Sequence, residues 1–261
     1  MASYKEEFMG FRYNGISSES MGIKTRMSTE SRMPNIRNLT EKIAGKHGIF
    51  DFGETFSERE ITITCFIPPG KSDYELQQVK DKINEWLNPE NGLQPLILDT
   101  APDRFYFARL KDGFSYDRIV RNTGTFELAF FCPDPFAYAL DDEIFCLTSS
   151  ANVIRNKGNH ESAPVYQISG LLSDDSEIIR VTVNGEGMGV VGPLFDGETM
   201  IIDADAMTAK IVDADGNITN ALGQMKTLEF PFLKVGSNAI TIGVTKGSLG
   251  LLKINAKSRW L

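Results

Sequence analysis

Residues 60–67 have the sequence Glu-Ile-Thr-Ile-Thr-Cys-Phe-Ile, which alternates regularly along its length. In an extended chain Ile61, Ile63 and Cys65 lie on one face, and the threonines and phenylalanine between them lie on the other. A Pro-Pro-Gly sequence follows and ends the strand, because proline has no N–H to donate to a ladder. This segment predicts a central strand of a β-rich domain.

Further strands are predicted on both sides of it. Thr125–Phe131 is almost continuously apolar, which is typical of a strand covered on both faces. Leu96–Leu98 and Phe105–Leu110 are shorter candidates. Phe8–Met21 predicts a strand pair around Asn14-Gly15, a favoured hairpin turn.

One helix is predicted at about residues 72–88. Ser72 and Glu75 have the spacing of a capping box, in which each side chain accepts a hydrogen bond from the other residue's free N–H. An apolar face follows at helical spacing, formed by Leu76, Val79, Ile83, Trp86 and Leu87. We therefore expect Trp86 to pack against a sheet.

The segment from about residue 22 to residue 56 has a different character. It is polar, short of aliphatic clusters and interrupted by Pro34, Gly45, Gly48 and Gly53. So long a segment without a core pattern favours an extended arm or a long hairpin. We hypothesise that this arm crosses to an adjacent subunit, where it adds a strand or covers a sheet edge.

A domain boundary is predicted near residue 138. The sequence Cys132-Pro-Asp-Pro-Phe-Ala-Tyr138 places two prolines within four residues, which stops a sheet. Beyond it, short apolar runs alternate with turn signals such as Asn184-Gly185 and Asp196-Gly197, as in an all-β sandwich. We predict a domain of residues 1–138 and a second of residues 139–261, in a mainly β protein whose N-terminal half is α+β.

Composition narrows the function. The 261 residues carry a net charge of −8, which argues against specific nucleic-acid binding, and Lys24, Arg26, Arg32 and Arg37 are interpreted as part of a solvated loop. The three cysteines are widely spaced, and we interpret Cys65 and Cys132 as buried apolar side chains. We find no signal peptide or apolar run long enough to cross a membrane, so we expect synthesis in a cytoplasm.

No catalytic motif emerges. His47 and His160 lack partners at metal-ligand spacing, and there is no phosphate-binding loop. Gly185-Glu-Gly-Met-Gly189 opens no helix and is interpreted as a turn and strand edge. The sequence from Asp213 to Asn217 resembles a calcium loop but lacks the glycine and glutamate that such a loop requires, so a hairpin turn is expected.

Paired carboxylates alone could support glycoside cleavage. The most noticeable carboxylates each have an expected structural role at a turn or strand end; these are Asp134, Asp203, Asp205 and Glu229. We predict no enzyme activity and no catalytic, cofactor-binding or metal-binding residues.

Several segments resemble phage distal tail proteins. Arg118–Tyr138 resembles the end of their N-terminal domain, and Gly45-Lys-His-Gly48 before the strand at 60–67 is similar to their glycine-flanked turn. Asn156-Lys-Gly-Asn159 with Pro164 resembles the opening of their C-terminal domain. Later matches are Thr199–Asp203, Phe230–Leu233 with Gly236–Ile240, and the end from Lys253 to Leu261. The order of these segments carries the resemblance, and residues 22–40 match little.

The resemblance implies an architecture and a role. The N-terminal domain would be a β-sandwich with one helix and a long extension, and the C-terminal domain a galectin-like β-sandwich. Six copies would form a ring, or two such rings stacked face to face. The ring would join the tail tube to the tail-associated tip protein, and to receptor-binding proteins where a baseplate exists. The protein would lie at the tail tip of a siphovirus or prophage-encoded virion.

Two alternatives remain open at this point. One is a carbohydrate-binding adhesion module of the tail tip, for which the C-terminal half offers six aromatic candidates: Phe145, Tyr166, Phe195, Phe230, Phe232 and Trp260. The other is an enzyme that cleaves glycan or peptidoglycan, which the absence of a catalytic motif disfavours.

Overall fold

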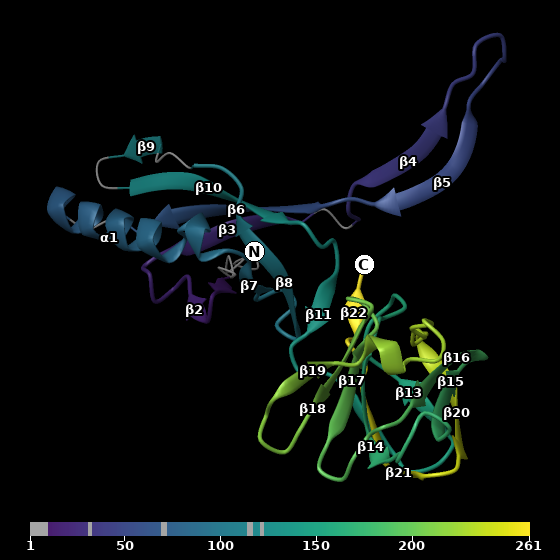
Figure 1. Ribbon diagram of the computed structural model, residues 1–261. Helices are drawn as coiled ribbons and strands as arrows, with labels where there is room; N and C mark the ends of the chain where they lie inside the picture. The colour runs from purple at the N-terminus through teal and green to yellow at the C-terminus, as the bar shows by residue number, and fades with distance from the viewer. Residues whose placement is uncertain (1–9, 31–32, 69–71, 114–116, 121–122) are drawn as a thin grey trace, which may run out of the picture. The chain divides into compact units, whose positions relative to one another are not determined.

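The chain divides into two compact units. The computed structural model describes residues 10–30, 33–68, 72–113, 117–120 and 123–261. The N-terminal unit spans Met1–Ala137 together with Leu261, and the C-terminal unit spans Tyr138–Trp260. The predicted fold class, mainly β with one α-helix in the N-terminal half, is confirmed (Figure 1).

The N-terminal unit is built on a sheet in the order β2-β1-β7-β8-β10-β6-β3, with β9 paired to β10. Its strands are β1 (Phe11–Tyr13), β2 (Ile16–Ser17), β3 (Lys24–Glu30), β4 (Ile36–Glu41), β5 (Phe50–Phe56), β6 (Arg59–Ile67), β7 (Gln94–Leu98), β8 (Arg104–Leu110), β9 (Asp117–Val120) and β10 (Thr123–Cys132). Strand β6 alternates buried and half-buried residues along its whole length, as its sequence predicts.

The strands of this unit fold over a shared aromatic core. Phe130 of β10 lies 5.8 Å from Phe11 and 5.3 Å from Tyr13 of β1 between ring centroids, although β1 and β10 are not neighbours in the sheet. Strands at different places in the sheet therefore meet face to face, as in a sandwich. The turn between β1 and β2 is the predicted Asn14-Gly15, and both residues have a positive φ.

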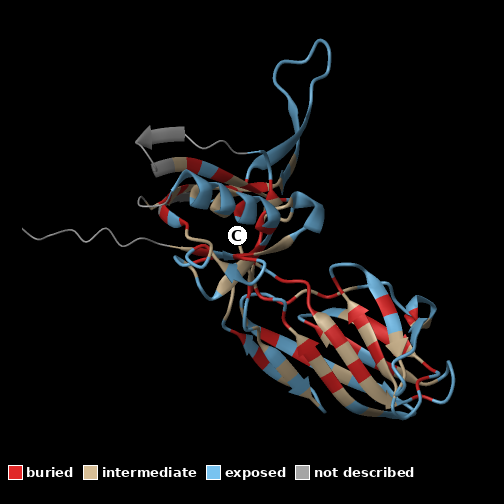
Figure 2. Ribbon diagram, turned by 90° about the vertical axis from the view of Figure 1, so that its left-hand side faces the viewer, coloured by how far each residue is buried: buried red, intermediate tan, exposed pale blue. Residues whose placement is uncertain are grey.

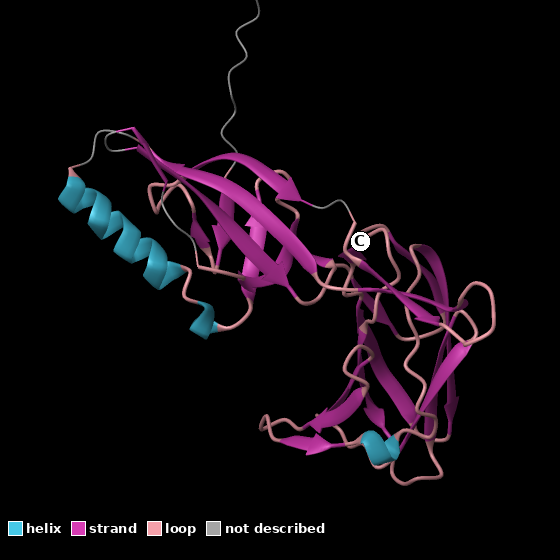
Figure 3. Cartoon of the chain, turned by 90° about the horizontal axis from the view of Figure 1, so that it is seen from above, coloured by secondary structure: helices cyan, strands magenta, loops and turns pink. Residues whose placement is uncertain are grey.

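Helix α1 (Asp73–Trp86) covers this core (Figure 3). The predicted capping box is present: the Glu75 N–H donates to Ser72 Oγ at 3.3 Å and the Ser72 N–H to Glu75 Oε2 at 2.7 Å. Trp86 stacks on Phe11 at 5.5 Å and donates its Nε1–H to the Tyr13 carbonyl at 2.9 Å. A short 3₁₀ turn, η1 (Pro89–Asn91), follows the helix.

The expected arm is shorter than residues 22–56. Strand β3 belongs to the main sheet, where it pairs with β6 from Lys24↔Phe66 to Glu30↔Ile61. The polar composition that suggested an arm here is the composition of a strand at the end of the sheet. Within the described part of this segment, β4 and β5 form a separate two-stranded hairpin.

The C-terminal unit is a β-sandwich of two sheets, ordered β12-β21-β14-β17-β18-β19 and β13-β20-β15-β16. Its strands are β12 (Ile144–Leu147), β13 (Ala151–Arg155), β14 (Val165–Leu171), β15 (Ile178–Val183), β16 (Glu186–Val191), β17 (Thr199–Asp203), β18 (Thr208–Val212), β19 (Ile218–Asn220), β20 (Gly236–Thr245), β21 (Ser248–Asn255) and β22 (Arg259–Trp260). A 3₁₀ turn, η2 (Leu222–Gln224), lies between β19 and β20, and β11 (Ala137–Ala139) lies at the boundary between the units.

One aliphatic core holds the two sheets of the sandwich together. Inward-facing residues of both sheets are fully buried there, including Tyr166, Ile168, Val181, Ile202 and Leu252. The Tyr166 hydroxyl donates to the Pro231 carbonyl at 2.8 Å, and burial raises the pKa of this hydroxyl. The polar end of this large side chain is thus satisfied inside the core.

Candidate functional site

The β4–β5 hairpin is exposed along most of its length (Figure 2). All of β4 and most of β5 are exposed, and among the described residues these two strands pair only with each other. At its base, the Ser57 N–H donates to the Asn35 carbonyl at 2.7 Å and Phe56 contacts Phe136 edge-on at 6.3 Å. An isolated two-stranded hairpin is only marginally stable in water, so this one depends on its attachment or on a partner.

The hairpin has one apolar face. Glu41 lies directly opposite Phe50, and strand alternation places Leu39 on the face of Glu41 and Phe52 on the face of Phe50. Phe50 and Phe52 stack with ring centroids 6.5 Å apart, and Phe52 is 65% exposed. We call Leu39, Phe50 and Phe52 the apolar face of the hairpin.

The opposite face is polar in its middle part. Asn38 pairs with Glu54 and Thr40 with Asp51 there, whereas the apolar pair Ile36 and Phe56 lies on the same face at the base of the hairpin. A register shift between Asn38 and Thr40 leaves Gly53, with φ of +98°, in a bulge. Ile43 and Ile49 near the tip are both exposed. The sequence pattern Phe-Asp-Phe between Gly48 and Gly53 is the signal that could have revealed the apolar face.

The two histidines lie in different units. His47 is exposed at the hairpin tip, and His160 lies in the C-terminal unit, where its Nδ1 is 3.1 Å from the Glu161 carbonyl oxygen. The described residues contain no group of three or more His, Cys, Asp or Glu that could hold a metal ion. No described helix has the length and hydropathy needed to cross a bilayer.

The singled-out carboxylates accept hydrogen bonds from the backbone. Asp134 accepts from the Phe136 N–H at 3.1 Å, and Asp203 accepts from Asp205 and Ala206 at 3.0 Å. Glu229 accepts from the Gly187 N–H at 3.2 Å. The expected structural roles of these three are confirmed, while Asp205 is an exposed turn residue.

The Asp213 segment is a turn of a β-hairpin, as predicted. The Asp213 carboxylate accepts from the Asn217 side chain at 2.9 Å and from the N–H groups of Asn217 and Asp215. The hydrogen bonds from Asn217, followed by those from the turn backbone, lower the pKa of Asp213. Gly185 lies in the turn between β15 and β16, so the glycine-rich segment also opens a strand and no helix.

The aromatic candidates for carbohydrate binding are mostly covered. Tyr166 is fully buried, Phe195 is 53% exposed, and the other four are half-buried. Sugar-binding sites usually present exposed aromatic rings beside polar groups. Phe195 is the candidate ring that this unit exposes.

Comparison with known proteins connects this geometry to phage tails. Residues 16–132 match the family model of the phage tail protein RIFT-related domain. The SPP1 Dit protein has the same fold, with a TM-score of 0.77 and 16% identity over 98% of this chain and 100% of that one. That protein is described as a paradigm of the hub adsorption apparatus in phages that infect Gram-positive bacteria. The predicted resemblance to phage distal tail proteins is thereby confirmed.

Weaker similarities also exist. Two chains from the phage p2 baseplate in its activated conformation, with Sr and with Ca, each give a TM-score of 0.48. The first is 11% identical over 96% of this chain and 99% of that one, and the second is 12% identical over 92% of each. No curated protein matches the sequence.

Proposed function

We propose, from the phage tail protein RIFT-related domain that residues 16–132 carry, that this protein is the distal tail protein of a siphovirus tail tip. Six copies form a ring that joins the tail tube to the tail-associated tip protein or the receptor-binding apparatus. The C-terminal sandwich is galectin-like and acts as a scaffold. Its role is architectural and not enzymatic, and the virion tail tip is where it acts.

The apolar face of the hairpin is the observation that carries this proposal. Leu39, Phe50 and Phe52 are exposed in the isolated chain, and exposed apolar clusters mark interaction surfaces. A neighbouring copy that received this face would bind head to tail, and head-to-tail contacts close into rings when the rotation allows. The hairpin would then be the arm that crosses between subunits.

A hairpin truncation tests the proposal. Removing Leu39–Phe52, which takes away the whole apolar face, and closing the strands with Asn-Gly spares β3, which belongs to the sheet. Sizing chromatography with light scattering should show a ring for the intact chain and a folded monomer for the truncation. A truncated chain that still forms hexamers would show that the hairpin is not part of the interface.

The carbohydrate-binding alternative rests on Phe195 alone. On a glycan array, the intact chain and the Phe195→Ala variant should give the same result, with no glycan bound by the intact chain alone. Reproducible binding that this substitution abolishes would replace the scaffold role of the C-terminal unit with adhesion.

A further inference from the structure

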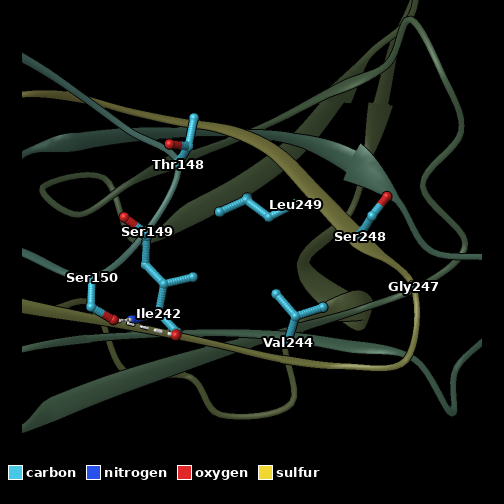
Figure 4. Close-up of a pocket in the computed structure, with 8 residues that line it drawn as sticks. All are labelled: Thr148, Ser149, Ser150, Ile242, Val244, Gly247, Ser248 and Leu249. Atoms are coloured by element: carbon cyan, nitrogen blue, oxygen red, sulfur yellow. Dashed lines mark hydrogen bonds between the residues drawn. The ribbon is translucent and has the colours of Figure 1, made fainter.

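A groove of about 490 Å³ lies at one end of the C-terminal sandwich (Figure 4). The side chains of Ile242, Val244 and Leu249 line it, together with the hydroxyls of Thr148, Ser150 and Ser248. None of its lining residues is charged or aromatic. This lining offers neither a ring for stacking on a sugar nor a charge for an ionic ligand.

The groove arises because β20 and β21, which are consecutive but lie in different sheets, extend beyond the strands β13 and β12 that flank them. Strand β12 ends at Leu147, opposite Leu252, and β13 begins at Ala151, opposite Ile240. Between them residues 148–150 connect one sheet to the other. The residues of β20 after Ile240 and of β21 before Leu252 therefore have no strand on that side.

The exposed edge of β20 presents main-chain groups to the groove. The Asn184 N–H donates to the Ala239 carbonyl at 2.9 Å, so the main-chain groups of Ala239 face β15. These groups alternate along an antiparallel strand, so those of Ile242 and Val244 face the opposite side. The Ile242 N–H donates to Ser150 Oγ at 2.8 Å. The Ser150 hydroxyl thus takes the hydrogen bond that a neighbouring strand would otherwise accept.

Val244 is the open position on this edge. It is 41% exposed, and no described residue hydrogen-bonds to its N–H or carbonyl on the groove side. The spacing of Ile242 and Val244 is that of successive hydrogen-bonded positions on a strand edge. The ligand that complements such an edge is another extended backbone.

We propose that this groove binds an extended segment of another tail protein by strand addition to β20. The segment pairs with the main chain of Ile242 and Val244, displaces the Ser150 hydroxyl, and places an apolar side chain against Val244 and Leu249. That the segment comes from a tail protein rests on the proposed function. The chain cannot fill the groove with its own flanking strands, because β12 and β13 are already paired with β21 and β20.

Two substitutions with opposite effects test this assignment. V244P removes the N–H that faces the groove and leaves the ladder to β15, which runs through Gly243 and Thr245, without a lost donor. S150A frees the Ile242 N–H for an incoming strand. V244T keeps the donor and the side-chain shape and is the matched control.

The measurement is binding to an array of overlapping 12-residue peptides that covers the tail proteins of the same virion. At least one peptide should bind the intact chain, with affinity reduced tenfold or more by V244P, increased by S150A and unchanged by V244T. L249K, which places a charge in the groove, should reproduce the loss if V244P proves poorly folded.

Three results would overturn the proposal: no peptide binds, binding is indifferent to both V244P and L249K, or the edge pairs only with a second copy of this chain. The native mass of the same variants keeps this test separate from the proposed function. If no peptide binds the groove, the unmodified chain should still form a ring. If the proposed function is wrong, the native mass of the unmodified chain already shows no ring.

Discussion

Gly170 shows how closely two strands approach within the C-terminal sandwich. It lies at a register shift between β14 and β21, and a Cβ there would lie 2.3 Å from the Ser248 carbonyl oxygen. The contact is with backbone, which cannot move aside as a side-chain end can. Glycine, which has no Cβ, therefore fits at this position without displacing the backbone of β21.

Substitution at this position should be costly. Gly170→Ala should lower the free energy of unfolding by about 1–3 kcal/mol, the usual cost of overpacking. Gly243→Ala in β20 is the control, since an added Cβ there has no neighbour within 4 Å. Urea denaturation measures both, and equal stabilities of the two variants would contradict the account.

The three cysteines should differ in reactivity. Cys65 and Cys132 are buried, and burial raises the pKa of the Cys65 thiol to about 12, so it stays protonated near neutral pH. Cys146 is exposed on β12. A chromogenic disulfide reagent should titrate one thiol in the native protein and three in denaturant. More than one fast native thiol would show that a buried strand is accessible.

At the scale of single elements, α1 depends on its first turn. Ser72 and Glu75 satisfy each other's free N–H groups there. Ser72→Ala should cost about 1 kcal/mol of stability, whereas Ser72→Asp, which also caps, should cost little. Thermal melting of the two variants checks this, and indistinguishable losses would exclude a capping contribution.

The hairpin makes a face-specific prediction. Leu39→Ser with Phe52→Ser should reduce the fraction of assembled protein at least tenfold. Because these side chains are exposed in the monomer, its stability should change by no more than about 0.5 kcal/mol. Asn38→Ser with Thr40→Ser changes the polar face and is the matched control. Equal loss of assembly in both pairs would mean that the hairpin's faces do not differ in function.

Elements with strong local signals could be predicted from the sequence, and elements defined by their partners could not. The capping box and apolar spacing of α1 and the alternation of β6 are complete within a few residues. Strand β3 lacks such a pattern and forms a strand because it pairs with β6. Similarly, β13 and β19 are short, and pairing with a neighbouring strand defines them.

The candidate site was only partly predictable for the same reason. Residues 22–56 indicated an extended element, but the apolar face depends on the cross-strand register of Glu41 with Phe50. Composition alone presented this segment as polar. Register depends on both paired strands, so it cannot be predicted from the sequence of either strand alone.

At the scale of the whole molecule, the proposed function makes the chain one subunit of a closed assembly. Carboxylates at its turns and strand ends accept hydrogen bonds from the backbone, and the β4–β5 hairpin carries three exposed apolar side chains on one face, Leu39, Phe50 and Phe52. Both features suit a protein whose function is to bind copies of itself and its neighbours.

Native mass spectrometry of the intact chain over a range of concentrations tests this most directly. With a subunit mass of 29.0 kDa, the account predicts a species of about 174 kDa, or about 348 kDa for two stacked rings. A single species of 29.0 kDa that persists at the highest concentration would contradict it.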